Sequence, residues 1–317
     1  MDEVAKVSVA QFDEHLLVKL ILEVLAKYQT AELIVQPGDD AAVLDKLAKP
    51  TITADLLIED VHFKTNWSSA ADVGTRAAAA NLADLIAMGA TPVALTVSLG
   101  LPESTLVGDV LELVEAICVE ARLCSAQVVG GDVTKSEKLV ISITAVGDCE
   151  SRLPILRSGA KVGDRVGLIG RAGYAQTGLE MLSRGITEPN EFVTAHQRPE
   201  VSYQAGISAW QQATAMIDVS DGLLVDLSHI ARASGVAISL SRSELSNLVT
   251  PALRSAAAAL SVDPIQLLLG GGDDHGFAIT APSLPDSAIA IGEVIAGSGV
   301  LLDNEPAQLL GYRHFSG

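Results

Sequence analysis

Short strand-like segments alternate with longer helical segments along most of this 317-residue chain. Residues 93–101 place apolar side chains at every second position, which is the period of a half-buried strand. Residues 70–88 are rich in alanine and leucine, and residues 12–28 repeat apolar side chains every three to four positions, so both segments predict helices. Because the alternation continues to residue 295, the sequence predicts a mixed α/β (α+β) fold.

The chain is long enough for two domains, since a domain averages about 150 residues. A turn-forming segment, residues 151–154, follows the strand predicted over residues 138–147. We therefore expect an N-terminal domain over residues 1–153, with a mixed sheet and helices, and a C-terminal α/β domain over residues 154–317.

The charge balance and the cysteines exclude several classes of protein. With 21 Lys and Arg against 39 Asp and Glu, the net charge is −18, so binding of nucleic acid through phosphate contacts is not expected. Cys118, Cys124 and Cys149 fit neither a zinc site nor a disulfide framework. The acidic N-terminus does not resemble an export signal, and glycine and proline interrupt the longest uncharged stretch, residues 85–102. We expect a cytoplasmic protein that does not enter a membrane.

Several carboxylates occur in short segments that contain glycine or a hydroxyl residue, where apolar strands are predicted to end. Glycine lets backbone N–H groups approach an anion, and a nearby carboxylate can hold Mg²⁺ against the oxygens of that anion. The joint recurrence therefore indicates a site for several Mg²⁺ ions and a polyphosphate. The five segments, which we read as turns, are residues 38–40, 53–55, 130–132, 218–222 and 270–274.

Taken singly, these segments have ordinary explanations. Ser220 or Asp221 could simply cap the helix that is predicted to begin near Leu223. Asp84 is different, because an acid in a helix of Ala, Leu, Ile and Met needs a partner such as a metal or an arginine. The usual glycine-rich nucleotide motifs are absent, so a phosphate enzyme of this sequence must depend on metals more than on a loop lysine.

Taken in order, the motifs resemble those of the thiamine-monophosphate kinase family, within the superfamily of aminoimidazole ribonucleotide synthetase. The resemblance extends from Phe12 to Phe315 and implies the two-domain fold of that superfamily. The matching segments are residues 38–44, 55–63, 81–90, 130–132, 157–160, 218–223, 271–274 and 311–315.

The resemblance implies transfer of the γ-phosphoryl group of ATP, as co-substrate, directly to thiamine monophosphate, giving thiamine diphosphate and ADP. It also implies a homodimer paired through the N-terminal halves, with each site set between the two domains. The implied Mg²⁺ ligands are Asp40, Thr53, Asp55, Asp84, Asp132, Asp218 and Asp221; the implied ATP contacts are Gly131, Arg157 and Ser220; and the implied thiamine monophosphate contacts are His62, Asp273 and Tyr312.

No catalytic base is expected, because the acceptor phosphate oxygen is already ionised at neutral pH. Catalysis would then consist of alignment and charge stabilisation by the metals. Three positions depart from the family pattern: Ala54 replaces a hydroxyl residue, Asp60 replaces a common glycine, and Asp273 is one methylene shorter than the typical glutamate.

Two other functions stay open at this point. One is another ATP-dependent enzyme of the same superfamily, such as an aminoimidazole ribonucleotide synthetase. The other is a non-catalytic module that binds Mg²⁺ and nucleotide.

Overall fold

The computed structural model describes residues 3–29, 33–38, 41–188, 190–308 and 311. Asp40 and Tyr312, for which metal and substrate contacts are implied, lie outside the described residues. Internal contacts divide the chain into two compact units. The first comprises Met1–Leu85 and Ala90–Arg152, and the second comprises Ile86–Gly89 and Leu153–Gly317.

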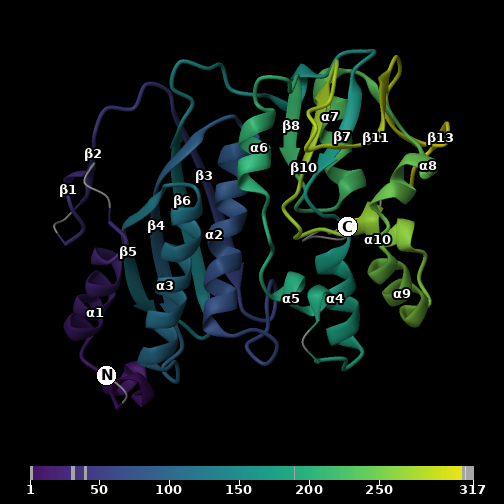
Figure 1. Cartoon of the computed structure of the whole chain (residues 1–317). Helices are drawn as coiled ribbons and strands as arrows, with labels where there is room; N and C mark the ends of the chain where they lie inside the picture. The colour runs from purple at the N-terminus through teal and green to yellow at the C-terminus, as the bar shows by residue number, and fades with distance from the viewer. Residues whose placement is uncertain (1–2, 30–32, 39–40, 189, 309–310, 312–317) are drawn as a thin grey trace. The chain divides into compact units, whose positions relative to one another are not determined.

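The first unit is built on a four-stranded sheet with the order β3-β6-β4-β5, in which only the β4–β5 pair is parallel. Helices α2 and α3 lie together, because Gly74 lets the backbones approach: a Cβ there would meet Leu113 O at 2.3 Å (Figure 1). The elements are α1 (Glu14–Ala26), β1 (Leu33–Val35), β2 (Val43–Leu44), β3 (Pro50–Ile58), α2 (Ala70–Ala87), β4 (Thr91–Leu101), α3 (Val107–Leu123), β5 (Gln127–Lys135) and β6 (Val140–Asp148).

The two faces of this sheet differ in burial. Leu95 and Ile143 point to one face and are at most 1% exposed. On the opposite face, the edge strand β3 presents Ile52, which is 68% exposed, and Leu56, which is 48% exposed. The sheet therefore has one covered face and one open, partly apolar face.

The second unit contains a seven-stranded mixed sheet with the order β13-β12-β9-β11-β7-β10-β8. Its core gathers apolar side chains from the strands and from helix α7, among them Val166, Ile217 and Leu227. The elements are β7 (Arg165–Ile169), α4 (Tyr174–Ser183), α5 (Glu191–Gln197), α6 (Tyr203–Ala209), β8 (Ala215–Asp218), α7 (Leu223–Ser234), β9 (Ala237–Leu240), α8 (Arg242–Leu245), α9 (Pro251–Leu260), α10 (Pro264–Gly270), β10 (Phe277–Ala281), β11 (Ile289–Ile295), β12 (Gly299–Leu302) and β13 (Glu305–Pro306).

The helix boundaries of the second unit follow from local sequence signals. Thr250 and Asp263 accept backbone N–H bonds at the starts of α9 and α10, and each helix has proline in its first turn. Gly235, with φ +67°, ends α7 in the left-handed conformation. Within the described part of the chain, no single helix is long and apolar enough to cross a membrane; α9 and α10 reach that length only as a pair bent by 100°.

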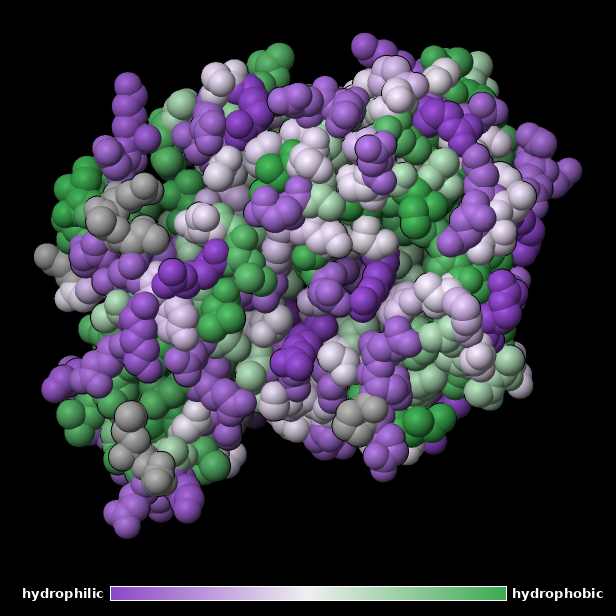
Figure 2. Space-filling model, in the orientation of Figure 1, coloured by the Kyte–Doolittle hydropathy of each residue, from purple (hydrophilic) through white to green (hydrophobic). Residues whose placement is uncertain are grey.

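Hydrophilic and hydrophobic side chains are interspersed over the surface. Figure 2 shows hydrophilic residues spread across the viewed face, with smaller hydrophobic areas between them. Hydrophilic side chains are therefore not confined to one part of that face.

Two of the segments that we interpreted as turns are strands. Residues 53–55 lie inside β3, and residues 130–132 lie inside β5. Gly131 is required by packing between strands, because a Cβ at this position would lie 1.7 Å from Val97 O of the neighbouring strand. Gly131 thus allows β5 to approach β4 closely, whereas Gly130, with φ +156°, has nothing within 4 Å of a Cβ.

We predict that Gly131→Ala lowers the unfolding midpoint more than Gly163→Ala does. Gly163 has a positive φ of +96° but nothing within 4 Å of a Cβ, so alanine there should cost only about 1–2 kcal/mol of backbone strain. Gly131 has no positive φ, but alanine there must displace the β4 backbone, which lies 1.7 Å from the Cβ position. Urea denaturation followed by circular dichroism measures both; an equal loss in the two variants would contradict the packing explanation.

Candidate functional site

In the first unit, the structure brings Thr53, Asp55 and Asp84 to one face of β3. The Thr53 hydroxyl donates a hydrogen bond of 2.6 Å to Asp84 Oδ2, which joins the strand to helix α2. Asp55 follows two residues later on the same face of the strand. All three side chains are half-buried. The acid that the sequence singled out in an alanine-rich helix therefore has a hydroxyl partner.

Asn81 lies one helical turn before Asp84 and has an unusual environment. It is 1% exposed, and its Nδ2 donates to Ala77 O at 3.0 Å. Its Oδ1 has no hydrogen-bond partner, and among the described residues it is the one buried side-chain polar atom of which this is true. Carboxylate, hydroxyl and amide oxygens are the donors that a hard divalent cation takes. The residues present at this end of β3 and α2 fit such a cation.

Gly131 and Asp132 do not join this group within one chain. The strand pairing places Leu56, Ser142, Ser98 and Asp132 in one row, so Asp132 points to the open face of the sheet. Thr53 and Asp55 point to the opposite face. In addition, β5 and β3 are the two edges of the sheet, about 14 Å apart at 4.8 Å per strand. The implied ligands of this unit are thus divided between two places.

His62 follows strand β3 and has one ring nitrogen already engaged. The backbone N–H of Ile58 donates to His62 Nδ1 at 3.0 Å, so in the neutral ring the proton is on Nε2. The nearby Asp60, which departs from the family pattern, has φ +66° and forms an ion pair with Lys138. This hydrogen-bonded contact raises the pKa of Lys138. The extra charge beside His62 is therefore met by a lysine.

In the second unit, Asp218 ends strand β8 and is buried. Its Oδ2 lies 3.1 Å from His275 Nδ1, and the His275 side chain is equally buried. The backbone then turns through Ser220, Asp221 and Gly222 into helix α7. Ser220 and Asp221 follow Asp218 closely in the sequence, and the side chains of both are half-buried.

Neither Ser220 nor Asp221 caps α7, which was one of the two interpretations left open. The N-cap residue is Gly222, with no side-chain cap. Instead, Asp226 Oδ2 accepts the backbone N–H groups of Ser220, Asp221 and Gly222, each at 3.1 Å. Burial and then the charges of Asp218 and Asp221 raise the pKa of Asp226 to about 8. The sequence analysis missed this residue, although its place four residues after Gly222 would have allowed such a bond.

His229 lies one turn further along α7. One of its ring nitrogens and the carboxylate oxygens of Asp221 and Asp226 all lie within 4.8 Å of one another. Burial, followed by the charges of Arg157 and Arg232, lowers the pKa of His229. Arg157 is exposed in a short 3₁₀ turn, and its carbonyl accepts a bond of 2.9 Å from Ser234 Oγ. Arg157, the implied ATP contact, thus lies close enough to helix α7 for its charge to act on His229.

The loop between α10 and β10 lies against the turn of residues 218–222. Asp273 N donates to Ser220 O at 2.9 Å, and His275 N donates to Val219 O at 3.0 Å. Asp273 and His275 have φ values of +62° and +49°, which are uncommon for residues with a side chain. Asp273 is therefore placed next to Ser220, as a member of the same cluster.

Asp274, the next residue, holds the start of helix α4. Its carboxylate accepts the backbone N–H groups of Tyr174 and Ala175 at 3.2 and 2.9 Å. Complete burial raises its pKa to about 6, against the lowering effect of these bonds. This acid has a structural role.

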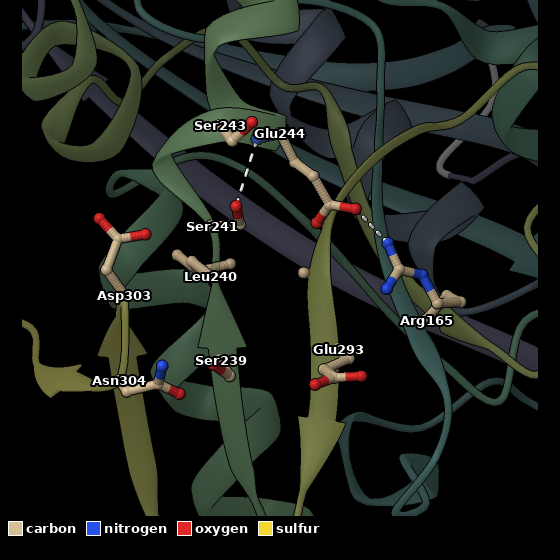
Figure 3. Close-up of a pocket in the computed structure, with 10 residues that line it drawn as sticks. Arg165, Ser239, Leu240, Ser241, Ser243, Glu244, Glu293, Asp303 and Asn304 are labelled. Atoms are coloured by element: carbon tan, nitrogen blue, oxygen red, sulfur yellow. Dashed lines mark hydrogen bonds and ion pairs between the residues drawn. The ribbon is translucent and has the colours of Figure 1, made fainter.

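A polar pocket of about 380 Å³ in the second unit contains none of the expected site residues. Figure 3 shows Arg165 pointing to Glu244, with which it forms an ion pair, while Glu293 and Asp303 line other sides. Because its one cation is already paired, this pocket offers no free group for a phosphate. We do not assign the phosphate chemistry to it.

We predict that Thr53→Val lowers the free energy of unfolding by about 1–3 kcal/mol, the usual contribution of a hydrogen bond to a charged group. Thr53→Ser keeps the hydroxyl and should lose less. Thr51→Val is the matched control, because Thr51 lies on the same face of β3 and contacts only Cys149 Sγ and a peripheral carbonyl. Urea midpoints that fall equally for Thr53→Val and Thr51→Val would contradict a stabilising Thr53–Asp84 bond.

Residues 38–149 match the family model of the N-terminal domain of AIR synthase related proteins. The thiamine-monophosphate kinase of Mycobacterium tuberculosis is 40% identical over 286 residues, which cover 89% of this chain and 86% of that protein. The enzyme of Aquifex aeolicus is 33% identical over 287 residues, covering 88% and 92%.

Solved structures agree with this relation. The crystal structure of thiamine-monophosphate kinase from Stenotrophomonas maltophilia superposes with a TM-score of 0.81 at 30% identity, covering 95% of this chain and 99% of that one. A structure described as AaThiL complexed with AMPPCP and TMP gives a TM-score of 0.78 at 29% identity, covering 99% and 98%. Hydrogenase maturation protein HypE, at 18% identity, shares the fold with a TM-score of 0.71, covering 95% and 94%. These thiamine-monophosphate kinases are 33–40% identical to this chain over most of its length, and on that basis this chain belongs to the thiamine-monophosphate kinase family.

Proposed function

We propose that the chain catalyses Mg²⁺-dependent transfer of the γ-phosphoryl group of ATP to thiamine monophosphate. A phosphate oxygen of thiamine monophosphate forms the new bond to the γ-phosphorus, and the bond from that phosphorus to the β,γ-bridging oxygen breaks, giving thiamine diphosphate and ADP. The observation that carries the proposal is the similarity to thiamine-monophosphate kinases over 89% of the chain.

The charges of the reactants explain why a protein of this kind needs cations. ATP and a phosphate monoester are both anionic, and this chain itself has a net charge of −18. Bringing them together at a few ångströms costs several kcal/mol unless cations intervene. Bound Mg²⁺ would neutralise the phosphate oxygens and stabilise the charge of the transition state.

The residues that would hold these ions form two sets. In the first unit they are Asp40, Thr53, Asp55 and Asp84, of which the last three share one face of β3. In the second unit Asp218 ends strand β8, and Asp221 lies in the turn that follows it. Both sets offer oxygen ligands only, which suits Mg²⁺.

The remaining groups bind and orient the reactants in this proposal. Arg157 offers a forked guanidinium to a nucleotide phosphate, and Ser220 offers a hydroxyl. His62, whose Nδ1 is occupied, would donate from Nε2 to thiamine monophosphate. Asp273 and Tyr312 complete the contacts to this substrate. No side chain is required to remove a proton, because the acceptor oxygen carries none at neutral pH.

The protein would act as a homodimer in the cytoplasm, where ATP and Mg²⁺ are available. The open face of the first sheet supports the dimer, because Ile52 and Leu56 are exposed there although strands normally bury such side chains. Asp132 and Gly131 lie on the same sheet, with Asp132 on that face. A second copy seated on it would bring Asp132 beside the partner rather than beside Asp55 of its own chain. Three buried free cysteines suit a reducing compartment.

We predict that purified protein with ATP, MgCl₂ and thiamine monophosphate yields equal amounts of thiamine diphosphate and ADP, separated by liquid chromatography. Asp84→Asn in the first unit and Asp218→Asn in the second should each lower kcat/KM at least about 100-fold, since charge stabilisation of phosphoryl transfer depends on the cations. Glu293→Gln, an exposed acid of the polar pocket, is the control and should keep full activity.

Other outcomes of this assay separate the alternatives. ADP without thiamine diphosphate would move the acceptor to another substrate of the superfamily. A folded protein that is stabilised by Mg²⁺ and nucleotide but never turns over would favour a binding module.

We predict that Ile52→Glu converts the dimer into monomers. A charged side chain at the centre of the contact would be buried without a partner, at a cost of several kcal/mol. Leu153→Glu is the control, because Leu153 is 82% exposed and lies in the other unit. Light scattering coupled to size exclusion distinguishes the 32.9 kDa chain from twice that mass; a monomeric parent protein would refute the dimer.

A further inference from the structure

We propose that Asp226 is a positioning residue for phosphoryl transfer, an inference that rests on the function proposed above. Its buried carboxyl group fixes the backbone of Ser220–Gly222, so that Asp218 and Asp221 face the cations. Asp226 is 2% exposed, and one oxygen, Oδ2, accepts three consecutive backbone N–H groups at 3.1 Å. The side chain can reach them because helical side chains lean toward the N-terminus of their own helix.

The three N–H groups belong to a position that often binds anions. Free N–H groups at the start of a helix, preceded by a glycine turn, commonly hold a phosphate. Here Asp226 Oδ2 already takes these donors, and Gly222 contributes no side chain. A nucleotide phosphate therefore cannot use them while the carboxylate stays in place. The backbone of this turn therefore does not cradle a phosphate, and contact with the nucleotide is left to the Ser220 hydroxyl and to cations held by Asp218 and Asp221.

The same clamp also fixes the neighbouring loop. Ser220 O accepts Asp273 N, Val219 O accepts His275 N, and Val219 N donates to Gly276 O at 2.7 Å. Asp273 and His275 are held at positive φ by these contacts. If the backbone of Ser220 and Asp221 moved, Asp273 would move with it. Asp226 touches none of the reacting groups, yet it sets the places of residues proposed to bind both the cations and thiamine monophosphate.

Electrostatics link the clamp to cation binding. One carboxylate oxygen of Asp221 and one of Asp226 lie within 4.8 Å of each other, and Asp218 lies three residues before Asp221, so ionised carboxylates repel one another here. A divalent cation held by Asp218 and Asp221 would offset that repulsion. Cation binding should therefore tighten the clamp, and loss of the clamp should weaken cation binding.

A second acid in this chain provides the matched control. Asp148 accepts the backbone N–H groups of Ala48, Lys49 and Glu150, each at 2.8 Å, and is 8% exposed. These bonds lower its pKa. Asp148 lies at the end of β6, and no site residue is expected there. Asp148→Asn and Asp226→Asn thus each replace the carboxyl group of a similar three-donor clamp. Of the two clamps, only that of Asp226 holds a turn with proposed metal ligands.

The first test measures cation binding without turnover. Free Mn²⁺, the probe ion, is titrated against the full chain and followed by electron paramagnetic resonance, and unfolding midpoints are recorded with and without MgCl₂. We expect Asp226→Asn to weaken Mn²⁺ binding by about tenfold or more, the size found for residues that orient metal ligands, and Asp148→Asn to leave it within twofold. Asp226→Glu, which keeps the charge, should restore part of the affinity. Unchanged Mn²⁺ binding in folded Asp226→Asn would overturn the proposal.

The second test uses the unaltered chain and remains decisive even if the variants fail to fold. Hydrogen–deuterium exchange is measured for the amides of Ser220–Gly222 and for those of Ala48, Lys49 and Glu150, with and without MgCl₂. We expect Mg²⁺ to slow exchange in the first group and not in the second. Equal effects, or none, would overturn the coupling. Neither test needs kinase turnover, so inactivity toward thiamine monophosphate would refute the proposed function and leave this inference open to its own result.

Where the chain is active, the steady-state constants add a third readout. Loss of positioning should raise the Mg²⁺ concentration for half-maximal rate and KM for ATP in Asp226→Asn by about tenfold, with a smaller change in Asp148→Asn. A fall in kcat alone, at unchanged KM and Mg²⁺ dependence, would contradict a positioning role.

Discussion

Backbone and hydroxyl donors hold several of the buried and half-buried acids of this chain in place. A buried or half-buried carboxylate without a donor costs several kcal/mol, so its neighbours decide where it can stay. Asp84 is held by Thr53, Asp148 and Asp226 by three N–H groups each, and Asp274 by the start of α4. These donors fix the positions of the carboxyl groups before any cation binds.

Much of the fold could be predicted from the sequence, because residues 70–88 have the composition of a helix and residues 93–101 alternate apolar side chains as a strand does. The strand position of the two-glycine segment could not be predicted, because Gly131 is needed for a close contact with Val97 on a different strand. The direction of Asp132 depends on an irregularity in the β4–β5 pairing, which no local pattern reveals. Asp226 was overlooked because an acid in the first turn of a helix is ordinary, and only its burial distinguishes it.

The candidate site shows a similar division. The resemblance to the family supplied the residue types, and the structure decides which of them are neighbours. It brings Thr53 to Asp84 and Asp273 to Ser220, but it places Asp132 on the other face of the sheet from Asp55. Side chains that share a motif pattern therefore need not share a site within one copy of the chain. In the proposed dimer, a second copy on the open face would lie beside Asp132, which has no place beside Asp55 of its own chain.

The departures from the family pattern also have local physical consequences. Asp60 occupies a position with φ +66°, where a glycine would fit without strain, and Lys138 pairs with the carboxylate that the substitution adds. Asp273 keeps a carboxylate on a backbone at φ +62° that Ser220 holds by a hydrogen bond. An aspartate has fewer side-chain rotamers than a glutamate with which to reach a ligand from a fixed backbone. The backbone position of the turn therefore becomes more important. The backbone position of Asp273 thus depends on Asp226, because Ser220 is bonded to Asp273 on one side and to Asp226 on the other.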